Sequence, residues 1–327
     1  MKAVLVMPDR HLCYTDVPDP VLREGEVLVK IHAAALNRAD LMQREGNYPP
    51  PEGCPEWMGL EISGEIVELS HEAARRSDWK KGDRVCALLG GGGYAEYAAV
   101  PYDMLMPIPE GCSMEEAAAM PEAYATAYLN LVIEGNLRPG DTLLMHAGAS
   151  GLASVLIPMA KTLGARVITT VLSAEIGRSI AHLGADIVVD TSRQSIQEVL
   201  REQMEQGNAV DIAIDCLGGS GMGECLPFLS YGARWIMIAT LAGDLTQIDM
   251  RNIYVKNIRI IGSTLRSKAP KRKAEILASL VKNIWPLVEQ GKIKPTVYRI
   301  LPITKAEEAH DILYRGENVG KVVLRVE

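Results

Sequence analysis

The feature that most limits what this chain can fold into is a glycine-rich turn at residues 146–153 (HAGASGLA). The turn directly follows the apolar run TLLM and opens a helical pattern, which is the placement that a dinucleotide-binding turn requires. Glycines there let the backbone approach a pyrophosphate, and the N-terminus of the next helix offers free N–H groups. The alternative is a tight turn without a ligand, but the context favours a phosphate-binding turn.

An alternation of strands and helices predicts the fold around this turn. From about residue 120, short apolar segments alternate with longer segments whose apolar residues recur at three- and four-residue spacing. The strand candidates are TLLMHA, RVITTV, DIVVD, VDIAIDC, RWIMIAT and IRIIGST. Such alternation implies an α/β fold with a doubly wound parallel sheet, covered by helices on both faces.

The two ends of the chain have a different pattern. Near the start, AVLVM, EVLVKIHAAA, EISGEIVELS, RVCALLG and YAEYAAV are typical of strands. Near the end we expect a helix at 270–290, the strand VYRILPI, the helix KAEEAHDILYRG and the strand GKVVLRV. We interpret this tail as rejoining the β-rich front domain. The predicted domains are residues 1–121 with 265–327, which are β-rich, and residues 122–264, which are doubly wound.

Composition excludes several classes of protein. The 327 residues are 48% hydrophobic and 23% charged, which suits two globular domains rather than a disordered chain. The net charge of −7 argues against a general nucleic-acid or membrane-surface binder, and the basic cluster at 268–273 is typical of a solvated loop and helix start. No apolar run reaches the roughly 18 residues of a membrane span, and the first residues are too soon charged for a signal peptide. We therefore expect a cytoplasmic protein.

The cysteines indicate reduced thiols rather than disulfides. None of the six belongs to a CxxC pair, and they are spread through a long chain. No Cys/His cluster has the spacing of zinc ligands, so we predict no metal site.

The end of the second strand of the parallel sheet bears on the choice of nicotinamide cofactor. NAD-binding chains usually place an acid there, about 20 residues beyond the turn, on the ribose hydroxyl. This strand ends in Thr169-Thr170-Val171, and the lack of an acid permits a 2′-phosphate. Ser173 and Arg178 could bind that phosphate, although Ser173 is equally suited to capping the next helix.

Several segments, taken in order, resemble a known family. They are ALNRADLMQREGNYPPP, GLEISGEIVEL, MPIPEGCSMEEAAAMPEAYATAY, HAGASG, DCLGG and NVGKVVL. Across nearly the whole chain they are similar to the zinc-independent quinone oxidoreductases, the zeta-crystallin-like branch of the medium-chain dehydrogenase/reductase superfamily. Within it, they most resemble the subgroup of the tumour-suppressor-induced quinone oxidoreductase homologue. The resemblance implies a GroES-like catalytic domain, a Rossmann domain that binds NADPH, and a homodimer.

The resemblance also implies a reaction without zinc. The zinc branch has cysteine where Asn37 stands and histidine where Leu60 stands, and its four-cysteine lobe is absent here. Without these ligands no Lewis acid polarises an alcohol. We therefore expect hydride transfer to a quinone or another α,β-unsaturated carbonyl. The alternatives are an enoyl-thioester or alkenal reductase, and a weakly catalytic cofactor- or RNA-binding protein.

Functional residues follow from their positions in the matching motifs. Asn37 would line the site near the nicotinamide, Tyr48 would be a substrate-side wall or proton donor, and Thr126 would bond the nicotinamide side of the cofactor. The alternatives without a functional role are, in the same order, a turn-forming asparagine, a surface tyrosine packed on the proline run and a helix-surface threonine. The residues expected to hold the cofactor are Gly148, Ser150, Gly151, Leu152, Ser173, Arg178, Ala239, Leu241, Thr264, Arg266 and Asn318.

Two positions depart from the family pattern. Relatives often have a lysine and a tyrosine on the 2′-phosphate, where this chain has Ile176 and Thr191. Glu175 adds a negative charge beside Ser173. The expected cofactor is NADPH, and these departures leave NADH possible.

Overall fold

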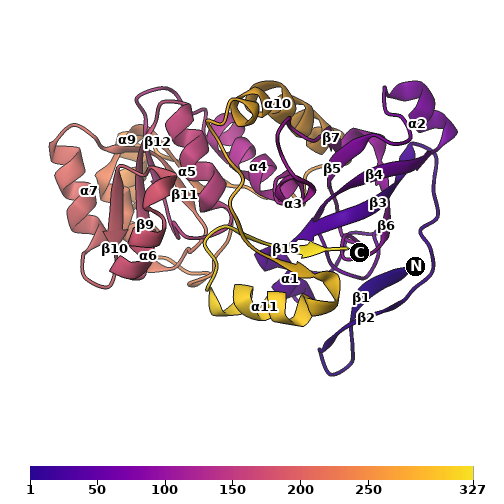
Figure 1. Ribbon diagram of the computed structural model, residues 1–327. Helices are drawn as coiled ribbons and strands as arrows, with labels where there is room; N and C mark the ends of the chain where they lie inside the picture. Colours follow the sequence, from indigo (N-terminus) through magenta and orange to yellow (C-terminus); the bar gives the residue numbers. More distant parts are fainter. Residues whose placement is uncertain (327) are drawn as a thin grey trace. The chain divides into compact units, whose positions relative to one another are not determined.

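The computed structural model describes residues 1–326 and divides them into two compact units. The β-rich unit consists of residues 1–125, 268–291 and those from 295 onward. The parallel-sheet unit consists of residues 126–267 and 292–294. Figure 1 shows the strands and helices of both units.

The parallel-sheet unit contains one six-stranded sheet. Its strands are β8 (Thr142–Met145), β9 (Arg166–Val171), β10 (Ile187–Asp190), β11 (Val210–Asp215), β12 (Leu229–Met237) and β13 (Arg259–Gly262). All neighbours are parallel, in the order β10-β9-β8-β11-β12-β13. The first and fourth strands are therefore adjacent, which is the strand order of dinucleotide-binding sheets and the point where they bind ligands.

Helices connect these strands, and polar side chains define where several of them begin. The helices are α5 (Ala153–Thr162), α6 (Ala174–Ser179), α7 (Ile196–Glu205), α8 (Ser220–Cys225) and α9 (Met250–Lys256). Ser173, Ser195 and Asp249 each accept a backbone N–H at the start of α6, α7 and α9. On one face of the sheet, Trp235 is fully buried in a core that includes Leu144 and Ile168.

The β-rich unit contains a seven-stranded sheet and a separate hairpin. The sheet consists of β3 (Glu26–Ala35), β4 (Glu61–Leu69), β5 (Arg84–Leu88), β6 (Tyr97–Pro101), β7 (Leu105–Pro107), β14 (Val297–Pro302) and β15 (Lys321–Arg325). The hairpin pairs β1 (Lys2–Val6) with β2 (Leu12–Asp16). The late strand β15 lies antiparallel to the early strand β3, with Val323 opposite Ala35.

Six helices accompany these strands. Five lie in the β-rich unit: α1 (Arg38–Arg44), α2 (His71–Arg76), α3 (Met114–Ala118), α10 (Pro270–Glu289) and α11 (Ala306–Arg315). The sixth, α4 (Pro121–Tyr128), spans the division between the units and is followed by a π-helix at Leu129–Glu134. Among residues 1–326, no helix is both long and apolar enough to cross a membrane.

The predicted fold class is confirmed, although β2 and β7 of the β-rich unit were not predicted. Short apolar segments located all six strands of the parallel sheet, but β12 begins at Leu229 rather than at Arg234. Gly232 has a positive φ of 76°, and the pairing with β11 is irregular over this stretch. This irregularity breaks the apolar alternation from which the start of the strand was predicted.

Candidate functional site

The glycine turn of the parallel-sheet unit packs closely on strand β9. Gly148 N donates to Thr170 O at 2.8 Å, and Ala147, whose φ is +57°, donates its N–H to Thr170 Oγ1 at 3.2 Å. A Cβ at Gly148 would lie 2.5 Å from Thr169 Oγ1. Glycine is therefore required at this position by packing, independently of any ligand.

The same turn leads directly into α5. Ser150 Oγ accepts the N–H of Ala153 at 3.1 Å, and Ser154 Oγ donates to Gly151 O at 2.9 Å. Ser150, Gly151 and Leu152 are half-buried, and they stand at the N-terminus of the helix. Because the first N–H groups of a helix lack intrahelical partners, this turn suits an anion such as a pyrophosphate.

The end of β9 presents groups of both charges. Ser173 caps α6 by accepting the N–H of Ile176 at 3.3 Å, and the exposed Arg178 lies in the last turn of that helix. Glu175 is exposed in the first turn. Asp190 pairs with Val171 in the sheet register, and hydrogen bonds from Ser192 lower the pKa of its carboxyl. Arg193 Nε lies 3.8 Å from Asp190 Oδ2, so the groups near the end of β9 are two arginines and two carboxylates.

Four further predicted residues follow the carboxyl ends of β12 and β13. Ala239 is half-buried, and Leu241, which donates its N–H to Cys216 O at 3.1 Å, is 56% exposed. Thr264 is exposed and its hydroxyl contacts that of Ser267, and Arg266 is half-buried. Because all strands are parallel, these loops leave the sheet at the same edge as the glycine turn. Thr126 lies on α4, where its carbonyl accepts Asn130 Nδ2 at 2.8 Å.

The β-rich unit holds the other three predicted residues. Asn37 directly precedes α1 and Tyr48 is half-buried in the loop that follows that helix. Asn318 is buried, and its Nδ2 donates to Gly320 O at 2.6 Å in the turn before β15. The side chain of Asn318 thus shapes the entry to that strand.

Asn37 belongs to a buried polar network formed by Asn37, Asp40, Glu61, Tyr94 and Lys321. Lys321 Nζ lies 2.6 Å from Glu61 Oε1 and donates to Asn37 Oδ1 at 2.7 Å. Asn37 Nδ2 donates to the same Glu61 oxygen at 3.0 Å. Lys321 is 4% exposed and Glu61 is fully buried, so both charges are removed from water.

Asp40 is the second acid of this network. It accepts the N–H of Asn37 at 2.7 Å, the hydroxyl of Tyr94 at 2.9 Å and the N–H of Gly59 at 3.3 Å. Burial nevertheless raises the pKa of Asp40 to about 6, and burial likewise raises the pKa of Tyr94 well above 10. Backbone approaches closely here, since a Cβ at Gly59 would lie 2.5 Å from Tyr94 N.

A third acid stands next to the network at the start of α4. The backbone N–H of Glu122 donates to Glu61 Oε2 at 2.9 Å. Burial first and the nearby charge of Glu61 second raise the pKa of Glu122 to about 7. Near neutral pH this carboxyl therefore exists in both protonation states.

Sequence reasoning missed Asp40, Glu61, Tyr94, Glu122 and Lys321. Two signals were present: an acid three residues after Asn37, at the spacing of a capping box, and charged residues placed within apolar strand segments. Each signal is local, whereas the network joins residues that are far apart in the chain. Among residues 1–326, no group of three or more His, Cys, Asp and Glu side chains could hold a metal ion.

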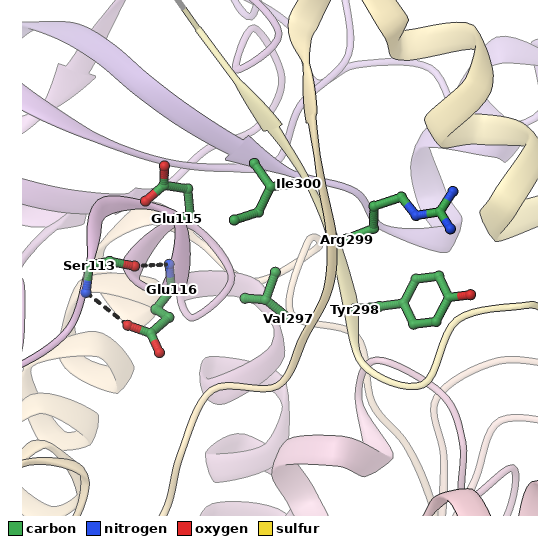
Figure 2. A pocket seen from close by; sticks show the side chains of 7 residues that line it. All are labelled: Ser113, Glu115, Glu116, Val297, Tyr298, Arg299 and Ile300. Carbon is green, nitrogen blue, oxygen red and sulfur yellow. Dashed lines mark hydrogen bonds between the residues drawn. The ribbon is translucent and has the colours of Figure 1, made fainter.

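A surface cavity of about 360 Å³ lies elsewhere in the β-rich unit, between the start of α3 and strand β14. Figure 2 shows Val297 and Ile300 on the side of Glu115, whereas Tyr298 and Arg299 point away from it. Ser113 and Glu116 are bonded to each other in a capping box. The cavity contains none of the predicted site residues.

Comparisons with known proteins agree on one family. A model described as "Alcohol dehydrogenase GroES-like domain" matches residues 23–110, and one described as "Zinc-binding dehydrogenase" matches residues 151–283. A Nematostella vectensis relative named "Quinone oxidoreductase-like protein 2 homolog" is 31% identical over 93% of this chain and 82% of its own length. The Mus musculus "Quinone oxidoreductase" is 29% identical over 99% of this chain and 97% of its own.

A solved structure supports the same grouping. The quinone oxidoreductase from Thermus thermophilus, which was also solved in its complex with NADPH, is 28% identical to this chain. The two superpose with a TM-score of 0.82 over 99% of this chain and the whole of the other.

Proposed function

Because this chain belongs to the quinone oxidoreductase branch of the medium-chain dehydrogenase/reductase superfamily, we propose that it transfers a hydride from NADPH to a quinone or another activated α,β-unsaturated carbonyl. The observation that carries the proposal is the glycine turn between β8 and α5, placed at the middle of a sheet with the dinucleotide-binding strand order. The relatives named as quinone oxidoreductases support the acceptor class.

The residues of the parallel-sheet unit fit a dinucleotide. The close packing of Gly148 on Thr169 holds the turn against β9, and Ser150, Gly151 and Leu152 would hold a pyrophosphate at the N-terminus of α5. The loops after β12 and β13, with Ala239, Leu241, Thr264 and Arg266, would contact the nicotinamide end. When bound, NADPH supplies the hydride, and the protein positions the acceptor and excludes water.

The acceptor oxygen gains charge during the transfer and needs a hydrogen-bond donor. Tyr48 is our candidate for that donor, and Thr126 is our candidate for orienting the nicotinamide. Asn37 would line the site, but its Oδ1 accepts from Lys321 and its Nδ2 donates to Glu61. A positioning role therefore suits Asn37 better than direct donation to the acceptor. Asn318 would support the chain next to the cofactor through its turn before β15.

We propose that the reaction proceeds without zinc. Asn37 and Leu60 stand where the zinc branch has cysteine and histidine, and an amide next to an ammonium group is a poor place for a second cation. Metal analysis of the purified protein tests this statement. Zinc bound in a one-to-one ratio, together with alcohol oxidation, would favour an alcohol dehydrogenase instead.

The proposed cofactor preference is NADPH, through Ser173 and Arg178. The opposing groups are the carboxylates of Glu175 and Asp190. Fluorescence titrations of the purified protein with NADPH and with NADH test the preference. We expect tighter binding of NADPH, and Arg178→Ala should weaken NADPH binding but not NADH binding. Arg201→Ala, an exposed arginine on α7, is the matched control. Tighter binding of NADH would reverse the assignment, and binding of neither would refute the reductase.

The acceptor is tested by profiling turnover with quinones, alkenals, enoyl thioesters and simple ketones. The proposal expects the quinones to have the highest kcat/KM. A preference for enoyl thioesters would support the enoyl-thioester reductase instead.

We also propose that two copies associate through the edge of the parallel sheet. Strand β13 is the edge strand, and Ile260 on it is 42% exposed. Tyr254 and Val255 on α9 and Tyr231 on β12 are more than half exposed. An edge strand flanked by exposed apolar side chains is the kind of surface that pairs with another chain.

A further inference from the structure

A lysine of the β-rich unit makes contacts that its place in the sequence does not suggest. Lys321 is the first residue of β15, directly before the apolar run at 322–324, and its ammonium group is buried against Glu61 and Asn37. A buried ion pair is weak evidence for stability, because an apolar pair of similar volume often stabilises a fold equally well. The contact with Asn37 points to a different role for this pair.

The two charges permit only one orientation of the Asn37 carboxamide. An ammonium group only donates hydrogen bonds, and a carboxylate only accepts them. Oδ1 therefore faces Lys321, and Nδ2 faces Glu61. A half-turn of the amide would place its NH₂ group against the ammonium and its oxygen against the carboxylate. Each neighbour would then lose its bond to the amide and face a group of the wrong polarity, although Lys321 and Glu61 would keep their own ion pair.

Asn37 also stands at the start of α1, where an asparagine side chain normally accepts an N–H of the first turn. A capping box with Asp40 is present there, and Asp40 accepts the Asn37 N–H at 2.7 Å. The capping box holds the residue at the start of the helix, while Lys321 and Glu61 hold its carboxamide. The position of Asn37 and the orientation of its amide are thus both fixed.

We propose that Lys321 is a positioning residue which, together with Glu61, fixes the Asn37 carboxamide in the single orientation required for hydride transfer. The ammonium group of Lys321 also places a positive charge beside Asn37, at the position where the zinc branch has a cysteine ligand. This inference rests on the proposed function, in which Asn37 lines the nicotinamide site. It adds to that function a residue that touches neither cofactor nor acceptor.

The central test replaces both charges at once. In Lys321→Met/Glu61→Leu neither partner of the ion pair stays buried without the other, so the double variant is expected to fold where Lys321→Met alone could fail. Lys305→Met, at an exposed lysine just before α11, is the matched control. We expect kcat to fall at least about tenfold in the double variant, a barrier increase of about 1.4 kcal/mol. The Kd of NADPH, which is bound by the other unit, should stay within about twofold.

Two further variants separate positioning from general destabilisation. Asn37→Leu should lose as much kcat as the double variant, and adding it to the double variant should cause little further loss, because all three residues act as one unit. Lys321→Arg, which keeps the charge and the donors, should recover part of the activity. A folded double variant with unchanged kcat would overturn the inference while leaving the proposed function intact.

A measurement that does not depend on enzyme activity distinguishes a failure of this inference from a failure of the proposed function. The side-chain NH₂ signals of Asn37 can be followed by NMR in asparagine-labelled protein and assigned by their loss in Asn37→Leu. We expect them to be slow to exchange in the native protein and fast in the double variant, and to be unchanged in Lys305→Met. Unchanged signals in the double variant would refute the role of Lys321. Normal NMR behaviour with no hydride transfer to any acceptor would instead refute the proposed function.

Discussion

Replacing Gly148 by alanine tests whether the turn between β8 and α5 is fixed by packing on β9. The new Cβ would lie 2.5 Å from Thr169 Oγ1 and 2.9 Å from Ile180 Cδ1, whereas carbon contacts favour about 3.5 Å or more. Both neighbours are buried, and Thr169 Oγ1 also donates to Met145 O at 2.8 Å. The turn must therefore move by about 1 Å, and such overpacking costs about 1–3 kcal/mol.

The assay combines urea unfolding with NADPH titration. We expect Gly148→Ala to lower the free energy of unfolding by about 1–3 kcal/mol. It should also weaken NADPH binding at least tenfold, because the displaced backbone no longer matches the pyrophosphate. Gly221→Ala on α8 is the matched control, since a Cβ there meets nothing within 4 Å. We expect Gly221→Ala to raise the free energy of unfolding by less than about 1 kcal/mol and to leave NADPH binding unchanged. Wild-type stability and affinity in Gly148→Ala would refute the reasoning.

Three further outcomes follow from the structure. Neither ring nitrogen of His310 has a hydrogen-bond partner among the described residues, and burial lowers its pKa to about 3. Between pH 7 and pH 5 this histidine gains a proton only in the unfolded state. The free energy of unfolding should therefore fall by about 2 kcal/mol over that range. His310→Leu should remove this loss in urea unfolding at the two pH values, and an equally acid-sensitive variant would contradict the assignment. The raised pKa of Glu122 has the opposite effect on stability, because the folded state favours the protonated carboxyl. Its contribution to the free energy of unfolding is complete below about pH 4.5 and is lost as the pH rises through 7. Glu122→Gln should therefore unfold at higher urea than wild type at pH 9 but not at pH 5. Ile260→Lys should convert a dimer into a monomer in light scattering, and a wild type that is already monomeric would refute the proposed association.

The sequence predicted the parallel-sheet unit because its signals are local. Apolar runs such as RVITTV, a turn with Gly148 at its centre and the capping residue Ser173 each lie within a few residues, and their order along the chain predicts the strands and helices. The limits of this reasoning appear at β12, where Gly232 interrupts the alternation and hides the first residues of the strand.

The polar network could not be predicted in the same way. Asn37 and Lys321 are 284 residues apart, and nothing near either of them in the sequence specifies that they touch. A lysine at the start of an apolar strand is normally placed at the surface, where its ammonium group stays hydrated. Only the pairing of β15 with β3 brings the ammonium group against Glu61 and Asn37. The roles of Asn37, Tyr48 and Thr126 came from resemblance to a family and stay predictions.

The late position of β15 has a consequence for how this protein is made. Asn37 and Glu61 leave the ribosome early, and the ammonium group that neutralises Glu61 arrives only after the whole parallel-sheet unit has been synthesised. Until then the nascent β-rich unit holds an acid without its cation and an edge of β3 without its partner strand. A chain interrupted before Lys321 would therefore leave this unit open to proteolysis even if its other unit had already folded. The polar core of the β-rich unit is thus completed only after the parallel-sheet unit has been synthesised.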